Sequence, residues 1–161
     1  MSKIFAPLAL CILALTPMVT FAAPISPASN LDLSLMEAGV LDQDYKYKDR
    51  ETAAKIFATL SSQLNSAFPA EASPGLEVTS VSISPYKSTY VFRYKTDMSK
   101  DVSSDLKKEF TNPAVLSELC TDIFMTERFF SANDHRITFV YHLKNGEKIA
   151  DLQINNTTCN V

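Results

Sequence analysis

The chain is poor in glycine, histidine and tryptophan, and these shortages exclude several classes of catalytic site. With three glycines in 161 residues, neither a phosphate-binding glycine loop nor the Gly-x-Ser-x-Gly turn of a serine hydrolase can be built. Tryptophan is absent, which argues against an aromatic-lined cleft where paired carboxylates hydrolyse glycosides. His135 and His142 lack the spacing of a zinc motif. The sequence therefore predicts no catalytic residue, no metal ligand and no cofactor.

One catalytic arrangement stays open because a catalytic triad needs no proximity in the sequence. His142, Asp151 and a serine could meet in space as the site of a small secreted hydrolase. An exported inhibitor of a hydrolase is a further alternative, and the loop 84–87 would then be its contact. We keep both as alternatives to a protein without catalytic activity.

Charge of positive sign is also scarce. The chain carries 15 basic and 18 acidic residues, for a net charge of −3. No basic stripe is present, which argues against nucleic acid and anionic membrane surfaces as partners. After residue 22 no apolar run is long enough to cross a bilayer, so no transmembrane span is expected there.

The first 22 residues have the three zones of a secretory signal peptide. Lys3 supplies the positive start, and residues 4–15 form the apolar stretch. Thr20 and Ala22 place small residues before the expected cleavage point. An uncleaved anchor would need about 18 or more uninterrupted apolar residues, and prolines interrupt this stretch. We expect residues 1–22 to be removed and the protein to be periplasmic or secreted.

Two cysteines, Cys120 and Cys159, remain after the predicted cleavage. In an exported chain a pair of cysteines is typical of a structural disulfide. A redox pair usually has Cys-x-x-Cys spacing, and two thiols without nearby histidines make a poor metal site. The sequence therefore predicts a Cys120–Cys159 disulfide.

Residues 23–47 form an N-terminal lead-in segment with an apolar cluster. Its leucines could belong to a short helix capped by Asn30, or to a segment that lies across the domain. The cluster could also dock on a partner protein. Packing on its own domain is the simpler explanation. The leucines in question are Leu31, Leu33 and Leu35.

Residues 48–161 read as a single domain in which helices alternate with β-hairpins. Apolar residues recur at helical spacing over 50–68, after Asp49 as N-cap, and again between 99 and 130. The segments 76–94 and 136–154 read as hairpins, with a bulge at Thr79–Ser80 and a type I′ turn at Asn145–Gly146. We therefore expect an α+β fold with an antiparallel sheet of about four strands and helices on one face.

Aromatic side chains gather on the first of these hairpins. Tyr90, Phe92 and Tyr94 share one face of a strand, and Tyr86 lies in the turn before it. Packing against the helix of residues 50–68 would explain the shared face. An exposed face rich in tyrosine would instead suit recognition of a protein. Tyr86 and Tyr90 therefore join the three leucines as candidate contact residues.

The region from Leu76 to Cys159 resembles two groups of exported bacterial proteins. The resemblance rests on the hairpin TSVSISPYKSTYVFRY, on Leu119–Cys120–Thr121 and on ITFVYHLKNGEKIADLQINNTTC. These features resemble small exported proteobacterial proteins assigned as quorum-sensing-regulated virulence factors, and the periplasmic part of type II secretion pilotins. The resemblance implies an α+β domain that binds a partner and has no known active site.

The chain departs from the pilotins at the lipid anchor. Pilotins are lipoproteins, whereas Cys11 lies in the middle of the apolar stretch and follows the bulky Leu10. No functional residue is carried over from either group. The sequence thus favours an exported, non-catalytic protein-binding domain, associated with secretion or virulence, whose partner is another envelope or secreted protein.

Overall fold

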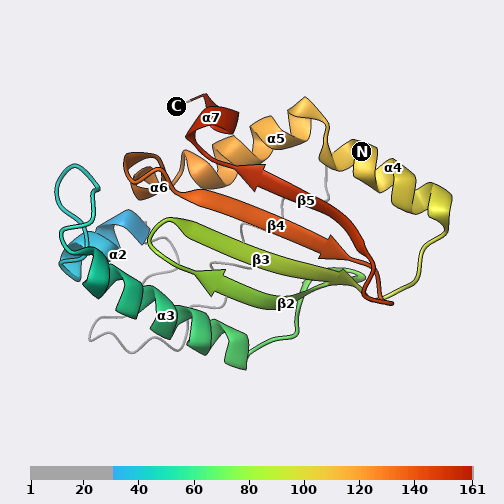
Figure 1. Ribbon diagram of the computed structural model, residues 1–161, viewed down its shortest axis with the longest axis horizontal. Coiled ribbons are helices and arrows are strands. Elements are labelled where there is room, and N and C mark those ends of the chain that lie inside the picture. Colours follow the sequence, from blue (N-terminus) through green and yellow to red (C-terminus); the bar gives the residue numbers. More distant parts are fainter. Residues whose placement is uncertain (1–30, 161) are drawn as a thin grey trace.

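A mixed five-stranded sheet forms the centre of the fold (Figure 1). The computed structural model describes residues 31–160, apart from the side chains of residues 100 and 101. The predicted signal peptide and the proposed cap Asn30 lie outside this range. The strands lie side by side in chain order, as β1 (Ala70–Ser73), β2 (Leu76–Ile83), β3 (Lys87–Tyr94), β4 (Arg136–His142) and β5 (Lys148–Ile154).

Three helices begin after polar N-cap residues, and Asp49 is the cap expected from the sequence. The side chains of Asp49, Ser99 and Asn112 accept hydrogen bonds from backbone N–H groups of the first turns that follow them. In Figure 1, α3 lies along β2, and α4 and α5 lie beyond β5. The helical segments are α2 (Leu31–Glu37), α3 (Arg50–Ser66), α4 (Lys100–Phe110), α5 (Pro113–Leu119), the π-helix η1 (Cys120–Phe124), α6 (Arg128–Ala132) and α7 (Asn156–Cys159).

The expected antiparallel sheet of four strands is wrong in two respects. β3 and β4 are parallel, from Lys87 opposite Arg136 to Arg93 opposite His142. The helices between them carry the chain back to the end of the sheet where β3 begins, and such a crossover is what parallel strands require. The sequence also missed β1, which pairs antiparallel with β2. It has four residues, Ala-Glu-Ala-Ser, too few for a clear alternation.

Both predicted hairpins are confirmed, but the second has a different turn. The register of β2 and β3 shifts between Val78 and Ser80, as the expected bulge requires. In the second hairpin the Leu143 N–H donates to the Glu147 carbonyl at 2.8 Å, which encloses three residues. Of the pair expected to form a type I′ turn, only Gly146 has a positive φ, 87°.

One face of the sheet carries the aromatic core. Side chains on alternate positions of β3 and β4 are buried, and the rings of Phe92 and Tyr141 stack at 5.0 Å. Phe110 of α4 stacks on the same Tyr141 at 4.3 Å. The intervening side chains of β3 and β4 are partly or fully exposed. The described helices therefore pack on the core face, as expected, and the opposite face is called the outer face below.

Polar side chains of α3 cover the edge of β2 that β1 does not reach. Asn65 binds both backbone groups of Val81, accepting from the N–H at 2.9 Å and donating to the carbonyl at 2.6 Å. The Ser61 hydroxyl accepts from the Ile83 N–H at 2.8 Å. Backbone groups that a neighbouring strand would otherwise satisfy are thus bonded to a helix.

Candidate functional site

Reciprocal hydrogen bonds between the starts of α2 and α6 hold the N-terminal segment on the domain. In each direction a carboxylate accepts from backbone N–H groups. The buried Asp32 carboxylate accepts hydrogen bonds from the N–H groups of Arg128, at 2.8 Å, and Phe129, at 3.1 Å. In return Glu127 accepts from the Asp32 N–H at 3.1 Å. Each carboxylate therefore satisfies free N–H groups at the start of the other helix.

The Glu127 carboxylate lies in an electrostatically unfavourable place. Burial raises the pKa of Glu127, and the neighbouring Asp32 carboxylate raises it further. Hydrogen bonds from the N–H groups of Asp32 and Leu31 lower it in part. The negative charge of Glu127 is therefore unfavourable where it lies, whereas its oxygen atoms still serve as acceptors for α2.

A second set of contacts holds the segment that follows α2. The Tyr47 N–H donates to Asn133 Oδ1 at 3.1 Å, and Asn133 Nδ2 donates to the Tyr45 carbonyl at 2.7 Å. The Arg128 guanidinium lies 5.3 Å from the ring centroid of Tyr45 and donates to its hydroxyl. Residues 31–47 thus pack on their own domain.

The three candidate leucines of this segment have different environments. Leu35 is 4% exposed and belongs to the core, so it is unable to reach a partner while α2 is docked. Leu31 and Leu33 are 37% and 55% exposed. Of the three candidate leucines, Leu35 is therefore enclosed while α2 is docked, and Leu31 and Leu33 remain exposed to solvent.

The two candidate tyrosines also separate. Tyr90 is buried and its ring stacks on Phe139 at 5.6 Å, so its side chain belongs to the core. Burial raises the pKa of Tyr90 to about 12. Tyr86 is exposed, with the Arg50 guanidinium 5.1 Å from its ring centroid. Tyr86 therefore remains available for contact.

A buried serine–histidine pair, which the sequence did not single out, lies where β3 and β4 begin. The Ser88 hydroxyl and His135 Nε2 are 2.9 Å apart, and His135 Nδ1 is 3.1 Å from the Pro85 carbonyl. A carbonyl can only accept, so Nδ1 carries the proton and Ser88 donates to Nε2. Both side chains are fully enclosed, which closes the pair to a substrate. Its geometry is that of a nucleophile and a base, but both groups are enclosed and bonded within the fold.

We expect acid to destabilise the protein through His135. Burial lowers the pKa of His135 from 6.5 to about 4. Between these two pH values His135 is protonated in the unfolded chain and neutral in the folded chain. The free energy of unfolding therefore falls as pH drops from about 6.5 to 4. The full loss is about 3 kcal/mol, at about 1.4 kcal/mol for each pH unit.

Urea unfolding across this pH range, for the wild type and His135→Phe, measures the effect. The carboxylates titrate in both proteins, so the difference between the two pH slopes belongs to His135. NMR titration of the imidazole protons gives the pKa directly. Equal slopes, or an imidazole that titrates near pH 6.5 in the folded protein, would contradict the prediction.

His142 does not meet the other members of the suggested triad. It is partly exposed on β4, and its Nδ1 lies 3.0 Å from the Gly146 carbonyl in the adjacent turn. Asp151 instead pairs with Lys148 at 2.7 Å. Within residues 31–160, no group of three or more histidine, cysteine or acidic residues is placed to hold a metal ion. Nor is any helix in this range long and apolar enough to cross a membrane.

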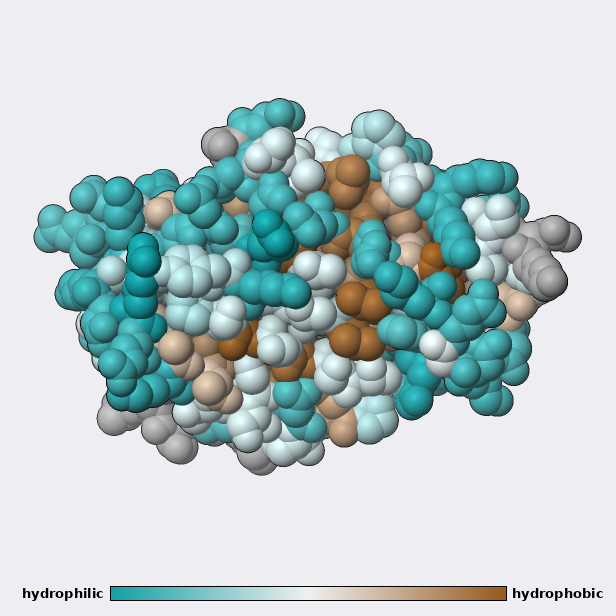
Figure 2. All heavy atoms as spheres, in the orientation of Figure 1, coloured by the Kyte–Doolittle hydropathy of each residue, from teal (hydrophilic) through white to brown (hydrophobic). Residues whose placement is uncertain are grey.

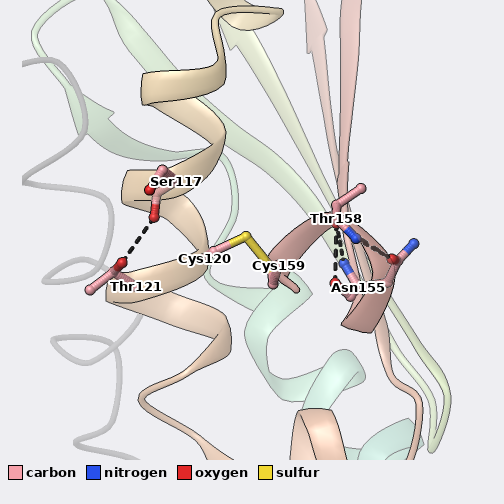
Figure 3. The surroundings of a disulfide bond; sticks show 6 residues. All are labelled: Ser117, Cys120, Thr121, Asn155, Thr158 and Cys159. Carbon is pink, nitrogen blue, oxygen red and sulfur yellow. Dashed lines mark hydrogen bonds between the residues drawn. A yellow bond between two sulfur atoms is a disulfide. The ribbon is translucent and has the colours of Figure 1, made fainter. Parts of the chain in front are cut away.

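The predicted disulfide is confirmed. Cys120 and Cys159 are joined with their Cα atoms 5.4 Å apart, which links the start of η1 to α7 (Figure 3). On one side the Thr121 hydroxyl donates to the Ser117 carbonyl. On the other, Asn155 and Thr158 form a capping box that starts α7. The bond therefore ties the helical layer to the end of the last strand.

Comparison with known proteins finds similarity in structure but not in sequence. No protein-family model and no curated protein matches this chain. A Pseudomonas aeruginosa protein assigned as secreted has a TM-score of 0.50 and 6% identity, over 68% of this chain and 95% of its own. At this identity the likeness shows a shared fold alone.

Two type II secretion pilotins have similar coverage. EpsS of Vibrio vulnificus has a TM-score of 0.47 at 14% identity, and AspS of Vibrio cholerae has 0.45 at 13%. Each covers 68% of this chain and 94% of its own. The Pseudomonas protein is thus one assigned as secreted and the two Vibrio proteins are type II secretion pilotins, the two groups that the sequence resembles.

Proposed function

We propose that this chain is an exported, non-catalytic domain that binds another protein of the bacterial envelope or secretome. The observation that carries the proposal is the pair of exposed leucines on α2, Leu31 and Leu33. Asp32 and Leu35 of the same short helix are buried and hold it against the domain. The leucines are therefore presented to solvent on a helix that is already held in place.

This arrangement favours binding on energetic grounds. Each exposed leucine gains about 25 cal/mol for every Å² of apolar surface that a partner covers. Because α2 is clamped through Asp32, little backbone freedom remains to be lost when the partner docks. Tyr86 is a further exposed aromatic residue of the kind that is enriched at protein interfaces.

Three observations support export. The pattern of residues 1–22 predicts a signal peptide, and the Cys120–Cys159 disulfide suits an oxidising compartment outside the cytosol. The fold is also similar to that of a protein assigned as secreted. A role in secretion or virulence is part of the proposal.

The proposal predicts that Leu31→Asp/Leu33→Asp loses its partner. Oxidised protein comprising residues 23–161 is used to capture proteins from periplasmic and envelope extracts, and the bound proteins are quantified by mass spectrometry. We expect at least one saturable protein whose capture falls tenfold or more in the double variant, because two carboxylates would be desolvated at the contact.

Val102→Asp is the matched control, since Val102 is 49% exposed on α4. It should keep the captured protein, and thermal unfolding should show that both variants remain folded. Unchanged capture by the α2 variant, or equal loss in the control, would refute α2 as the contact. If the wild type captures no protein at all, the proposed binding function is refuted.

A further inference from the structure

The outer face of β3 and β4 has a regular side-chain pattern that the proposed function does not use. The two strands are parallel and in register, so residues of like character lie directly side by side. A pair of cations comes first, then two threonines, two valines, and an arginine beside a histidine. These pairs are Lys87–Arg136, Thr89–Thr138, Val91–Val140 and Arg93–His142.

The first pair is an unneutralised positive site in an acidic protein. Lys87 and Arg136 are exposed, and neither forms an ion pair with any residue of the described chain. Neighbouring strands are about 4.8 Å apart, so two like charges here are unfavourable until an anion joins them. The chain as a whole has a net charge of −3, which makes this local excess of positive charge distinctive.

The other cations of the outer face are already neutralised. Arg93 pairs with Glu77 at 2.6 Å, and Lys148 pairs with Asp151 at 2.7 Å. An incoming anion therefore finds its free partners at the Lys87–Arg136 end. The uncompensated positive charge of the outer face therefore lies at one end of β3 and β4.

The middle of the outer face is apolar. Val91 and Val140 lie side by side and are only partly buried. They lie four residues from the cation pair, about 13 Å along a strand. Figure 2 shows hydrophobic residues at the surface over the middle of the sheet, within a largely hydrophilic surround. A ligand that covers this face thus needs an anionic end and an apolar middle.

We propose that the outer face of β3 and β4 binds an acidic segment of a partner protein. Carboxylates of the segment lie on Lys87 and Arg136, and apolar side chains about 13 Å away cover Val91 and Val140. The inference rests on the proposed function, because it gives the partner of that function a second, electrostatic contact. A protein segment is favoured over a small anion because the site couples a charged end to an apolar one.

The first test is an NMR titration of isotope-labelled protein with two synthetic peptides. One is Glu-Glu-Ser-Thr-Val-Val, whose valines follow the glutamates by four residues, and the other has lysines in place of the glutamates. We expect the acidic peptide to shift the amide signals of residues 87–93 and 136–142, and this binding to weaken as salt is raised. The lysine peptide should leave these signals unchanged.

Lys87→Glu/Arg136→Glu should raise the half-saturating concentration of the acidic peptide at least tenfold. Lys107→Glu/Lys108→Glu on α4 makes the same change in charge on exposed lysines and should leave it within twofold. Absence of shifts on β3 and β4, equal binding of the lysine peptide, or equal loss in the control would each overturn the inference. Binding of anionic vesicles or dimerisation through Lys87 and Arg136, in place of peptide binding, would overturn it too.

The two proposals can fail separately. If the acidic peptide does not bind but Leu31→Asp/Leu33→Asp still abolishes capture, the outer-face inference fails and the proposed function stands. If the peptide binds but no protein is captured by the wild type, the proposed function fails instead.

Discussion

Replacing Cys120 and Cys159 with serine should lower the free energy of unfolding by about 4 kcal/mol. The disulfide closes a loop with a sequence separation of 39 residues. Opening it lets the unfolded chain explore far more conformations, and the chain-entropy model gives the size of the loss. Urea unfolding of oxidised wild type and the double variant measures it.

The disulfide connects two separate layers of the fold, so its loss affects the stability of both. It joins η1 to the helix that follows β5, so the helical layer and the last strand lose a direct link when it opens. Cys120 is 5% exposed, and serine there also places a hydroxyl in the core. Wild type reduced with dithiothreitol separates the two causes, because it keeps the sulfur atoms. A loss below about 1 kcal/mol in the reduced protein would show that the bond adds little stability.

Asp32→Ala should cost about 3 to 4 kcal/mol of stability. The variant removes two hydrogen bonds from backbone N–H groups to a buried carboxylate, each worth about 1.5–3 kcal/mol, and leaves both groups unsatisfied. The same change should release α2, since Asp32 fixes it to α6. Urea unfolding gives the first quantity, and faster hydrogen exchange at the amides of residues 35–41 reports the second.

Glu127→Gln is the control for this prediction. Glutamine keeps an oxygen acceptor for the Asp32 N–H. It removes the carboxylate charge of Glu127, whose pKa is raised by burial and by Asp32. We expect its stability to stay within about 1 kcal/mol of wild type, or to rise slightly. If the two variants were equally destabilised, the Asp32 carboxylate would have no special part in holding α2.

The parts of this fold that short-range patterns determine could be predicted from the sequence. Asp49 caps the helix expected after it, and the alternation of β4 places Phe139 and Tyr141 in the core. The bulge near Ser80 interrupts the alternation of inward and outward side chains along β2, and this interruption is visible in the sequence. Each of these features depends on residues within a few positions of one another.

Features set by packing between distant segments could not be predicted. The parallel pairing of β3 with β4 depends on where the crossover returns the chain. The separation of Leu35 from Leu31 and Leu33 depends on which side of α2 faces the domain, which Asp32 sets from 96 positions away. A signal for the buried pair did exist, because Ser88 occupies an inward position of β3 and needed a partner. Nothing in the sequence named His135 as that partner.

The cover that α3 provides for β2 has a consequence for self-association. A sheet with two free edges can add copies of itself without end and grow into a fibre. Here the β1 side ends in a strand of four residues, and beyond it Ser61 and Asn65 occupy the exposed backbone groups of β2. Within residues 31–160, β5 is the one long edge strand left. A contact between two β5 strands would join two molecules only, so the sheet gives no route to a fibre.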